Sequence, residues 1–194
     1  MGLITTTEAK TYLNVTGSAE DTTIAELINV AGQALAHHCN RRLVAETVIE
    51  YQDGNGQRKL WLREPASVKP TIYVDANHAW GTDTQIAAAD LLWAAGRDGT
   101  SREVVYLDNV FSEGQSNIKA SYTSGFETAG MPEQVKQACR VQVARLYSEW
   151  KRATQRMDAL ASQSVAGWSQ QFLDKAGVDP LAAGLIAEYV TDGF

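Results

Sequence analysis

The chain has 194 residues, of which 44% are hydrophobic, and its formal net charge is -6 at neutral pH. This length suits one domain with appendages or two small domains, and the apolar content is sufficient for a buried core. The acidic balance argues against a dedicated nucleic-acid-binding protein, because such proteins usually carry excess positive charge. Basic residues are nevertheless concentrated in one stretch: residues 132–158 hold six Lys or Arg against three Asp or Glu, whereas residues 45–131 hold seven against twelve.

Two helices are predicted at the start of the chain. Thr5 and Glu8 have the Ser/Thr-x-x-Glu spacing of a capping box, which predicts a short helix over 5–13. A second helix is predicted over 21–40, because its apolar residues recur at the spacing of one helical face. Such a pair could suggest a DNA-reading helix-turn-helix, but the exposed face of the second helix lacks the Arg and Lys that phosphate contacts need. The apolar face of the second helix consists of Ile24, Leu27, Ile28, Ala31, Leu35 and Cys39.

The hydrophobic period changes to two after Val44, which predicts an antiparallel β insertion of five or six short strands over 44–125. Residues 53–56 (Asp-Gly-Asn-Gly) are typical of a hairpin turn, with a return strand over 59–63 that ends at Pro65. Pro70 places the next strand at a sheet edge or a bulge. The remaining predicted strands are a second hairpin, 91–93 with 104–107, and a last strand over 118–122.

The longest predicted element is an amphipathic helix over 132–160. Pro132 suits the first helical position, and one sector of the helical wheel is apolar except for Gln142. We expect this apolar stripe to pack on the second helix. The opposite face is basic, and it either faces solvent or contacts a partner.

After residue 160 the chain becomes small and polar, and Asp179-Pro180 predicts a last short helix. Residues 161–194 contain apolar anchors but no core of their own, so we expect an arm that docks on its own domain or on a neighbour. The anchors of this arm are Trp168, Phe172, Leu185, Ile186, Tyr189 and Phe194.

No catalytic constellation or metal site is predicted. The chain has no glycine-rich phosphate loop and no Gly-x-Ser-x-Gly elbow. Cys39 and Cys139 lie on apolar stripes, as reduced core thiols do, and the neighbouring His37 and His38 point about 100° apart on a helix, so they cannot hold one ion together. With no signal-like start and no long apolar run, we expect a soluble protein of the reducing cytoplasm that has no cofactor, no enzymatic activity and no membrane contact.

The order of these elements resembles the head-tail connector, or adaptor, family of tailed bacteriophages. The resemblance is strongest over 3–42 and weakest over 76–90. It is carried by Leu3-Ile4-Thr5, Glu8-Ala9-Lys10, Tyr12-Leu13, the 21–31 helical stripe, His38-Cys39-Asn40-Arg41, Tyr51-x-Asp53-Gly54, Leu60-Trp61-Leu62, Met131-Pro132 and the 168–172 segment before a final helix.

The resemblance implies a structural protein without catalysis. Such proteins form a homo-oligomeric ring, a dodecamer in the family, under the portal protein in the virion neck, and they join the DNA-filled head to a tail-side neck or tail-completion protein. Genome DNA would pass the channel without specific binding. The C-terminal arm often reaches the portal, which makes its six apolar anchors portal-docking candidates. The basic back of the long helix becomes the candidate contact between neighbouring subunits, through Lys136, Arg140, Arg145, Arg152 and Arg156.

The expected fold is therefore α+β: an adaptor domain over 1–160, with helices 5–13, 21–40 and 132–160 and the β insertion 44–125, and a C-terminal arm over 161–194. Two other functions stay open. A packaging accessory could bind DNA through the basic face of helix 132–160, with a steep salt dependence. A small hydrolase would need a pocket with a perturbed titrating group, which nothing in the sequence predicts.

Overall fold

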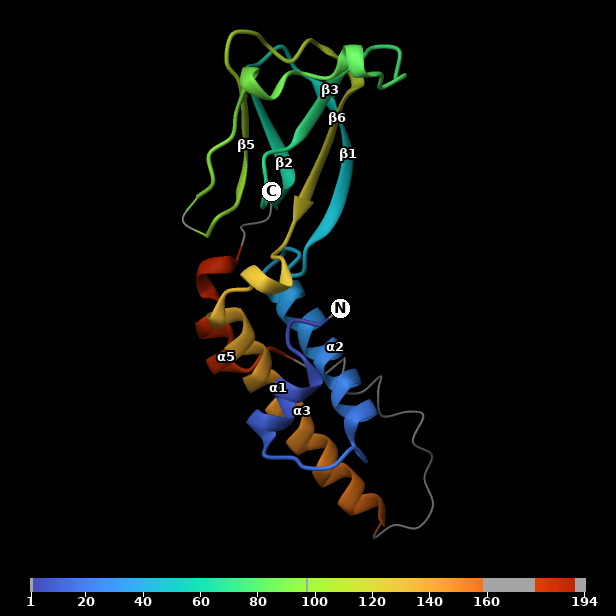
Figure 1. The fold of residues 1–194 in the computed structure, drawn as a ribbon, viewed down its shortest axis with the longest axis vertical. Coiled ribbons are helices and arrows are strands. Elements are labelled where there is room, and N and C mark those ends of the chain that lie inside the picture. Colours follow the sequence, from blue (N-terminus) through green and yellow to red (C-terminus); the bar gives the residue numbers. More distant parts are fainter. Residues whose placement is uncertain (1, 97, 159–176, 191–194) are drawn as a thin grey trace. The chain divides into compact units, whose positions relative to one another are not determined.

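A computed structural model describes residues 2–96, 98–158 and 177–190 of the chain. They form two compact units, a helical unit (Met1–Leu43 with Thr128–Phe194) and a β unit (Val44–Glu127), and Figure 1 labels the longer helices and strands of both. The expected α+β class is confirmed, because helices accompany a six-stranded sheet whose strand pairs are antiparallel. None of the described helices is both long and apolar enough to cross a membrane.

The first helix, α1 (Thr6–Leu13), starts at the predicted capping box. The backbone N–H of Glu8 donates to Thr5 Oγ1 at 3.2 Å, and the backbone N–H of Thr5 donates to Glu8 Oε2 at 2.7 Å. These two bonds satisfy donors that a helix start otherwise leaves without a partner. The helix ends at Asn14, which adopts the left-handed conformation with a φ of 55°.

The long helix is α3 (Glu133–Asp158), and it packs against α1, α2 (Asp21–His38) and α5 (Pro180–Leu185), as Figure 1 shows. The predicted packing of the second helix on the long helix is confirmed. Burial of two facing apolar stripes supplies most of the stability of such a helix pair. Trp150, expected in the stripe of α3, is only half-buried. The buried residues of the stripes are Ile24, Leu27, Ile28, Ala31 and Leu35 on α2, and Val135, Ala138, Cys139, Gln142, Val143, Leu146 and Ala153 on α3.

The β unit is built around its last strand. The sheet order is β1-β6-β2-β5-β4, and β3 also pairs with β6. The inner face of the sheet buries apolar residues from every strand, including Leu62, Ile72, Val104, Ile118 and Tyr122. The strands are β1 (Glu46–Gly54), β2 (Lys59–Ala66), β3 (Thr71–Val74), β4 (Leu91–Leu92), β5 (Ser101–Tyr106) and β6 (Gly114–Ser124), and short 3-10 turns occur at η1 (Thr82–Thr84), η2 (Ala88–Asp90), η3 (Thr128–Gly130) and η5 (Ala187–Tyr189).

The hairpin predicted at residues 53–56 is wrong. β1 pairs with β6 and not with the following strand β2. Side chains of β1 make hydrogen bonds to the backbone of β2 where a β1–β2 strand pair would have backbone bonds. Gln52 Nε2 donates to the carbonyl of Trp61 at 2.8 Å, and the buried Glu50 carboxylate accepts the backbone N–H of Arg63 at 3.3 Å. These polar side chains satisfy the backbone of β2, so a direct strand pair is not needed there.

The other strand predictions differ from the structure in one detail. The second hairpin is confirmed, because Leu91 pairs with Tyr106 and Leu92 with Val105. β3 begins directly after Pro70 and pairs with β6 alone among the strands, with a single further bridge from Tyr73 to Gln85, which fits the predicted edge position. Pro65 does not end β2 but lies inside it, in a stretch where the register between β2 and β5 is irregular. A proline is tolerated there because a bulge needs no ladder bond from its nitrogen.

Candidate assembly surfaces

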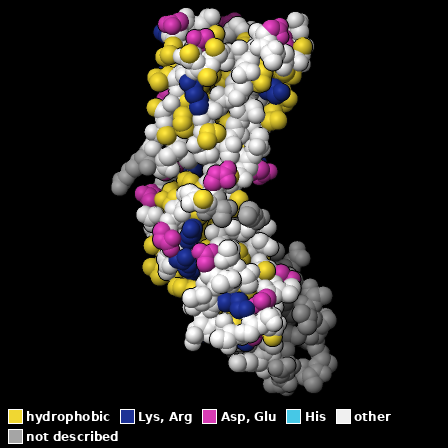
Figure 2. Space-filling model, in the orientation of Figure 1, with side chains coloured by type: hydrophobic (Ala, Val, Ile, Leu, Met, Phe, Trp, Pro, Cys, Tyr) yellow, Lys and Arg dark blue, Asp and Glu magenta, His cyan; other side chains and the backbone are white. Residues whose placement is uncertain are grey.

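The basic face of α3 is largely paired with carboxylates of its own helical unit. Arg140 lies 2.5 Å from Glu133 and 3.5 Å from Glu8. Arg145 Nε lies 3.2 Å from Glu149, one helical turn away. Figure 2 shows such basic and acidic side chains next to each other on the helical unit. Each exposed pair contributes only about 0–1 kcal/mol, but together they reduce the positive charge of this face.

The remaining predicted subunit-contact residues differ in their surroundings. Lys136 is half-buried and lines a pocket beside α1. Arg152 is exposed, and neither residue has an ion pair within the described part of the chain. Arg156 belongs to the last turn of α3, but its side chain is outside the described residues. Lys136 and Arg152 are therefore the cations of this face that a partner could still pair.

A polar clamp that the sequence did not reveal joins the start of α2 to α3. The carboxylate of Glu20 accepts hydrogen bonds from the Tyr147 hydroxyl and the Lys151 ammonium. The same ammonium lies 5.5 Å from the ring centroid of Tyr147 and 5.4 Å from that of Trp150. The bond from Lys151 and then the bond from Tyr147 lower the pKa of Glu20. Glu20 therefore stays ionised and holds the two helices together at neutral pH.

Two side chains of α3 bind the backbone of the segment that leads into α5. Gln142 is fully buried, and its Oε1 accepts the backbone N–H of Asp179 at 2.8 Å. One turn further along, Arg145 Nη1 donates to the carbonyl of Gly177 at 3.0 Å. The one polar residue of the predicted stripe is thus explained, because it binds the returning chain.

The short helix α5 packs on α3 and starts as predicted at Asp179-Pro180. Asp179 Oδ1 accepts the backbone N–H of Leu181 at 2.9 Å and so caps the helix. Of the predicted portal-docking residues, Ile186 and Tyr189 are buried within the helical unit, and Leu185 is half-buried. The others, Trp168, Phe172 and Phe194, lie outside the described residues.

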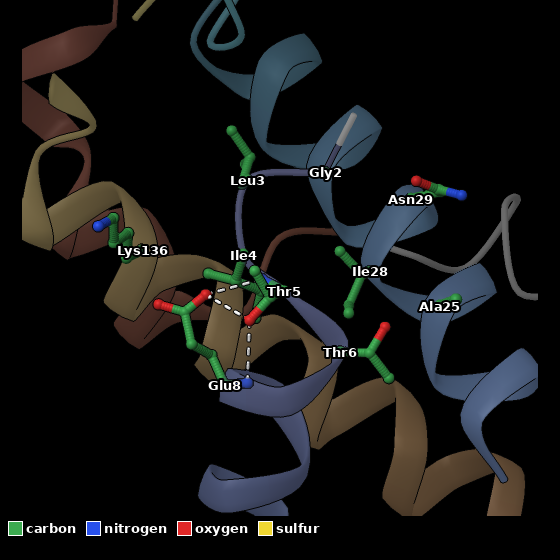
Figure 3. Close-up of a pocket in the computed structure, with 10 residues that line it drawn as sticks. All are labelled: Gly2, Leu3, Ile4, Thr5, Thr6, Glu8, Ala25, Ile28, Asn29 and Lys136. Carbon is green, nitrogen blue, oxygen red and sulfur yellow. Dashed lines mark hydrogen bonds between the residues drawn. The ribbon is translucent and has the colours of Figure 1, made fainter. Parts of the chain in front are cut away.

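A pocket of about 430 Å³ opens between the N-terminal segment, α2 and α3 (Figure 3). Thr5 and Glu8 lie in it, and Figure 3 shows that they bind each other. The backbone N–H of Thr5, then its hydroxyl, and more weakly Arg140 lower the pKa of Glu8. A carboxylate with a lowered pKa is a weaker proton acceptor, so Glu8 is poorly suited to act as a general base.

The two cysteines are buried thiols, as expected. Burial raises the pKa of Cys39 to about 11 and that of Cys139 to about 12. Thiols with such pKa values are poor nucleophiles, because the reactive form is the thiolate. Within the described ranges, no group of three or more His, Cys, Asp or Glu is placed to hold a metal ion.

An aromatic face on the outside of the β sheet was also missed from the sequence. Tyr51 on β1 and Tyr73 on β3 are the register partners of Lys119 on β6, one on each side. The ring of Trp80, from the loop after β3, lies 5.4 Å from the ring of Tyr51. We call Tyr51, Tyr73, Trp80 and Lys119, with Ile49, the outer aromatic face. Its residues come from separate segments, so only the strand pairing brings them together.

The fold is that of an α+β protein, and its described features are helix-packing contacts and exposed surfaces. Residues 2–173 match the head completion protein family, so the chain belongs to that family. No curated protein matches the chain.

Solved structures of similar fold come from particle necks. One is a chain of the "neck of empty GTA particle computed with C6 symmetry", with a TM-score of 0.59, 19% identity, and coverage of 99% of this chain and 91% of that chain. A chain of the virion of the native gene transfer agent (GTA) particle has the same TM-score and coverage at 17% identity. A third, from the neck of the native GTA particle computed with C12 symmetry, has a TM-score of 0.53, 15% identity, and coverage of 93% and 94%. These likenesses establish the shared fold.

Proposed function

We propose that this chain is a structural adaptor in the neck of a phage-like particle. Identical copies form a ring beneath the portal and link the DNA-filled head to the tail, without catalysis. The observation that carries the proposal is the family match over 2–173, together with a fold shared over nearly the whole length of a neck chain. Neck reconstructions with C6 and C12 symmetry support a ring of symmetric copies.

The charge of the chain suits a channel through which DNA passes. With a net charge of -6, the chain offers little of the counterion release that drives non-specific binding to DNA. The ion pairs of Arg140 and Arg145 further reduce the charge of the most basic helix. They speak against the alternative of a packaging accessory that binds DNA through this face.

The contact between neighbouring subunits is proposed to use the basic face of α3. Arg140 and Arg145 are held in ion pairs within the subunit, whereas Lys136 and Arg152 are the described cations that carboxylates of a neighbour could pair. Arg156, whose side chain lies outside the described residues, is proposed as a third contact. Charge complementarity of this kind determines the register in which neighbouring subunits bind more than it determines how tightly they bind. Assembly takes place in the host cytoplasm, before the neck is complete.

The portal contact is proposed to use the C-terminal segment, with α5 as its anchor. Ile186 and Tyr189 hold α5 on α3, and Gln142 and Arg145 bind the backbone just before it. The aromatic residues that flank this helix in the sequence, Trp168, Phe172 and Phe194, are proposed to contact the portal. Buried aromatic residues are the usual anchors of such interfaces.

The test is to mix the full chain with the portal protein of the same phage and to measure the mass of the complex. We expect a complex with several copies of the chain for each portal ring. The double variant Trp168→Ala/Phe172→Ala should bind the portal more weakly, and Trp61→Ala, an exposed tryptophan of β2, is the matched control. A chain that never joins portal rings, or a double variant that binds as well as the control, contradicts the proposal.

A further inference from the structure

The outer aromatic face is an exposed apolar surface with a cation at its centre. Half of the Tyr51 side chain and 55% of Ile49 remain exposed on β1. The Lys119 ammonium lies 5.2 Å from the ring centroid of Tyr73 and 5.9 Å from that of Trp80. Neighbouring residues on paired strands point to the same face, so these side chains form one continuous surface.

A loop with an unusual backbone holds Trp80 in this surface. The buried carboxylate of Asp75 accepts the backbone N–H groups of Asn77, Ala79 and Trp80 at 2.8 to 2.9 Å, and these bonds lower its pKa. His78 and Trp80 both adopt positive φ values, 57° and 56°. Such conformations cost free energy in residues other than glycine, and the bonds to Asp75 offset that cost. These bonds hold the backbone of Trp80 in the conformation that places its ring beside Tyr51.

The charges around the face indicate what can cover it. Lys119 has no carboxylate within ion-pair distance among the residues that the structure describes. The β unit as a whole is acidic, since residues 44–127 contain seven Lys or Arg and twelve Asp or Glu. Its field repels a phosphate backbone, which disfavours a nucleic acid as the occupant. A protein surface that brings a carboxylate to Lys119 and an apolar side chain to the rings is complementary in both respects.

The same β unit presents such a surface in the loop between β5 and β6. Asp108 and Glu113 are exposed there, and Val110 between them is 43% exposed. A ring of identical subunits needs two different complementary surfaces on each copy, and the aromatic face and this acidic loop make such a pair.

We propose that the outer aromatic face of one copy binds the acidic 108–113 loop of a second copy, with Lys119 opposite Asp108 and Glu113 and with Val110 against the rings of Tyr51 and Trp80. This inference rests on the proposed ring of identical subunits. It assigns to the β unit a contact separate from the one on α3.

Disulfide trapping between two variants of the full chain tests this contact. Thr71→Cys places a thiol on the outer face, Asn109→Cys places one in the acidic loop, and the native thiols are buried. We expect mixtures of the two variants to form a cross-linked dimer, both alone and bound to portal. Adding Lys119→Glu should lower the yield on the order of fivefold, and adding Trp80→Ala should lower it about tenfold.

A charge swap separates a specific contact from misfolding. Lys119→Glu in one chain and Asp108→Lys/Glu113→Lys in the other should each reduce trapping alone and restore it when combined. Tyr51→Ser should also lower the trapping yield, whereas Trp61→Ser, at a residue of the same unit with similar exposure (52% against 50%), is the matched control and should not. The inference is overturned if no cross-link forms either in the free chain or in the chain bound to portal. It is also overturned if these charge changes do not alter the yield. If the chain still joins portal rings, the proposed function stands without it.

Discussion

The backbone N–H of Asp179 donates to Oε1 of Gln142 at 2.8 Å, and the Gln142 side chain is fully buried in the apolar stripe of α3. This bond fixes the residue that caps α5, so one buried amide determines where the chain returns to the long helix. Within the part of the chain that the structure describes, Nε2 of the same amide has no partner. Gln142 therefore holds the C-terminal segment in position, while its buried amide nitrogen without a partner lowers the stability of the core.

We predict that Gln142→Leu loosens the C-terminal segment. The leucine keeps the volume and the burial, but the N–H of Asp179 loses its acceptor, which costs about 1–2 kcal/mol. Hydrogen exchange at Asp179 and its neighbours should become faster, and proteolysis after residue 176 should increase. Gln134→Leu, an exposed position on the same helix, is the control and should leave both unchanged.

We predict that acid weakens the clamp between α2 and α3. The pKa of Glu20 in the folded chain is below its ordinary value of 4.5, because Lys151 and Tyr147 bind the carboxylate. The stability that this group contributes is therefore present above about pH 4.5 and is lost as the pH falls through the lower folded pKa.

Urea unfolding of Glu20→Gln at several pH values checks the clamp. The wild type should lose more stability than this variant between neutral pH and pH 3, because the amide has no proton to gain. Glu26→Gln, an exposed position on α2 that makes no ion pair with a described residue, is the control and should behave as the wild type does. Equal losses of stability in the wild type and in Glu20→Gln would show that the Glu20 carboxylate does not stabilise the contact between α2 and α3.

We predict that Gly125→Ala destabilises the β unit more than Gly99→Ala does. Both glycines have positive φ, 90° and 77°, so alanine is strained at either position. At Gly125 the added Cβ would also lie 2.3 Å from the carbonyl oxygen of Val44, whereas nothing lies within 4 Å at Gly99. The strain alone costs about 1–3 kcal/mol, and the clash adds to it, which thermal unfolding of both variants measures. Equal melting temperatures would show that the backbone at Val44 moves away freely.

The helices were predictable because their signals are local. The Thr5–Glu8 box, the stripes of α2 and α3 and Asp179-Pro180 each lie within one or two turns of the element they define. Strand pairing was not local: the turn residues at 53–56 predicted a hairpin, yet β1 pairs with a strand more than sixty residues away. Periodicity identifies the buried face of a strand but not its partner.

The candidate surfaces were predicted only in part, because some of their residues come from segments far apart in the sequence. The basic face of α3 is visible in the sequence, but the carboxylates of Glu8 and Glu20 that pair with it come from the N-terminal segments. The outer aromatic face was not visible, because Tyr51, Tyr73 and Trp80 meet only through the pairing of β1, β3 and β6 and a loop with left-handed residues.

The most direct measurement for the central claim is a cryo-electron microscopy reconstruction of the phage particle that carries this chain. The account predicts a symmetric ring of copies between portal and tail, with α5 packed on α3 in each copy and the C-terminal segment in contact with the portal. A complete neck whose densities do not accommodate this fold, or a particle that assembles head and tail without the chain, would contradict it.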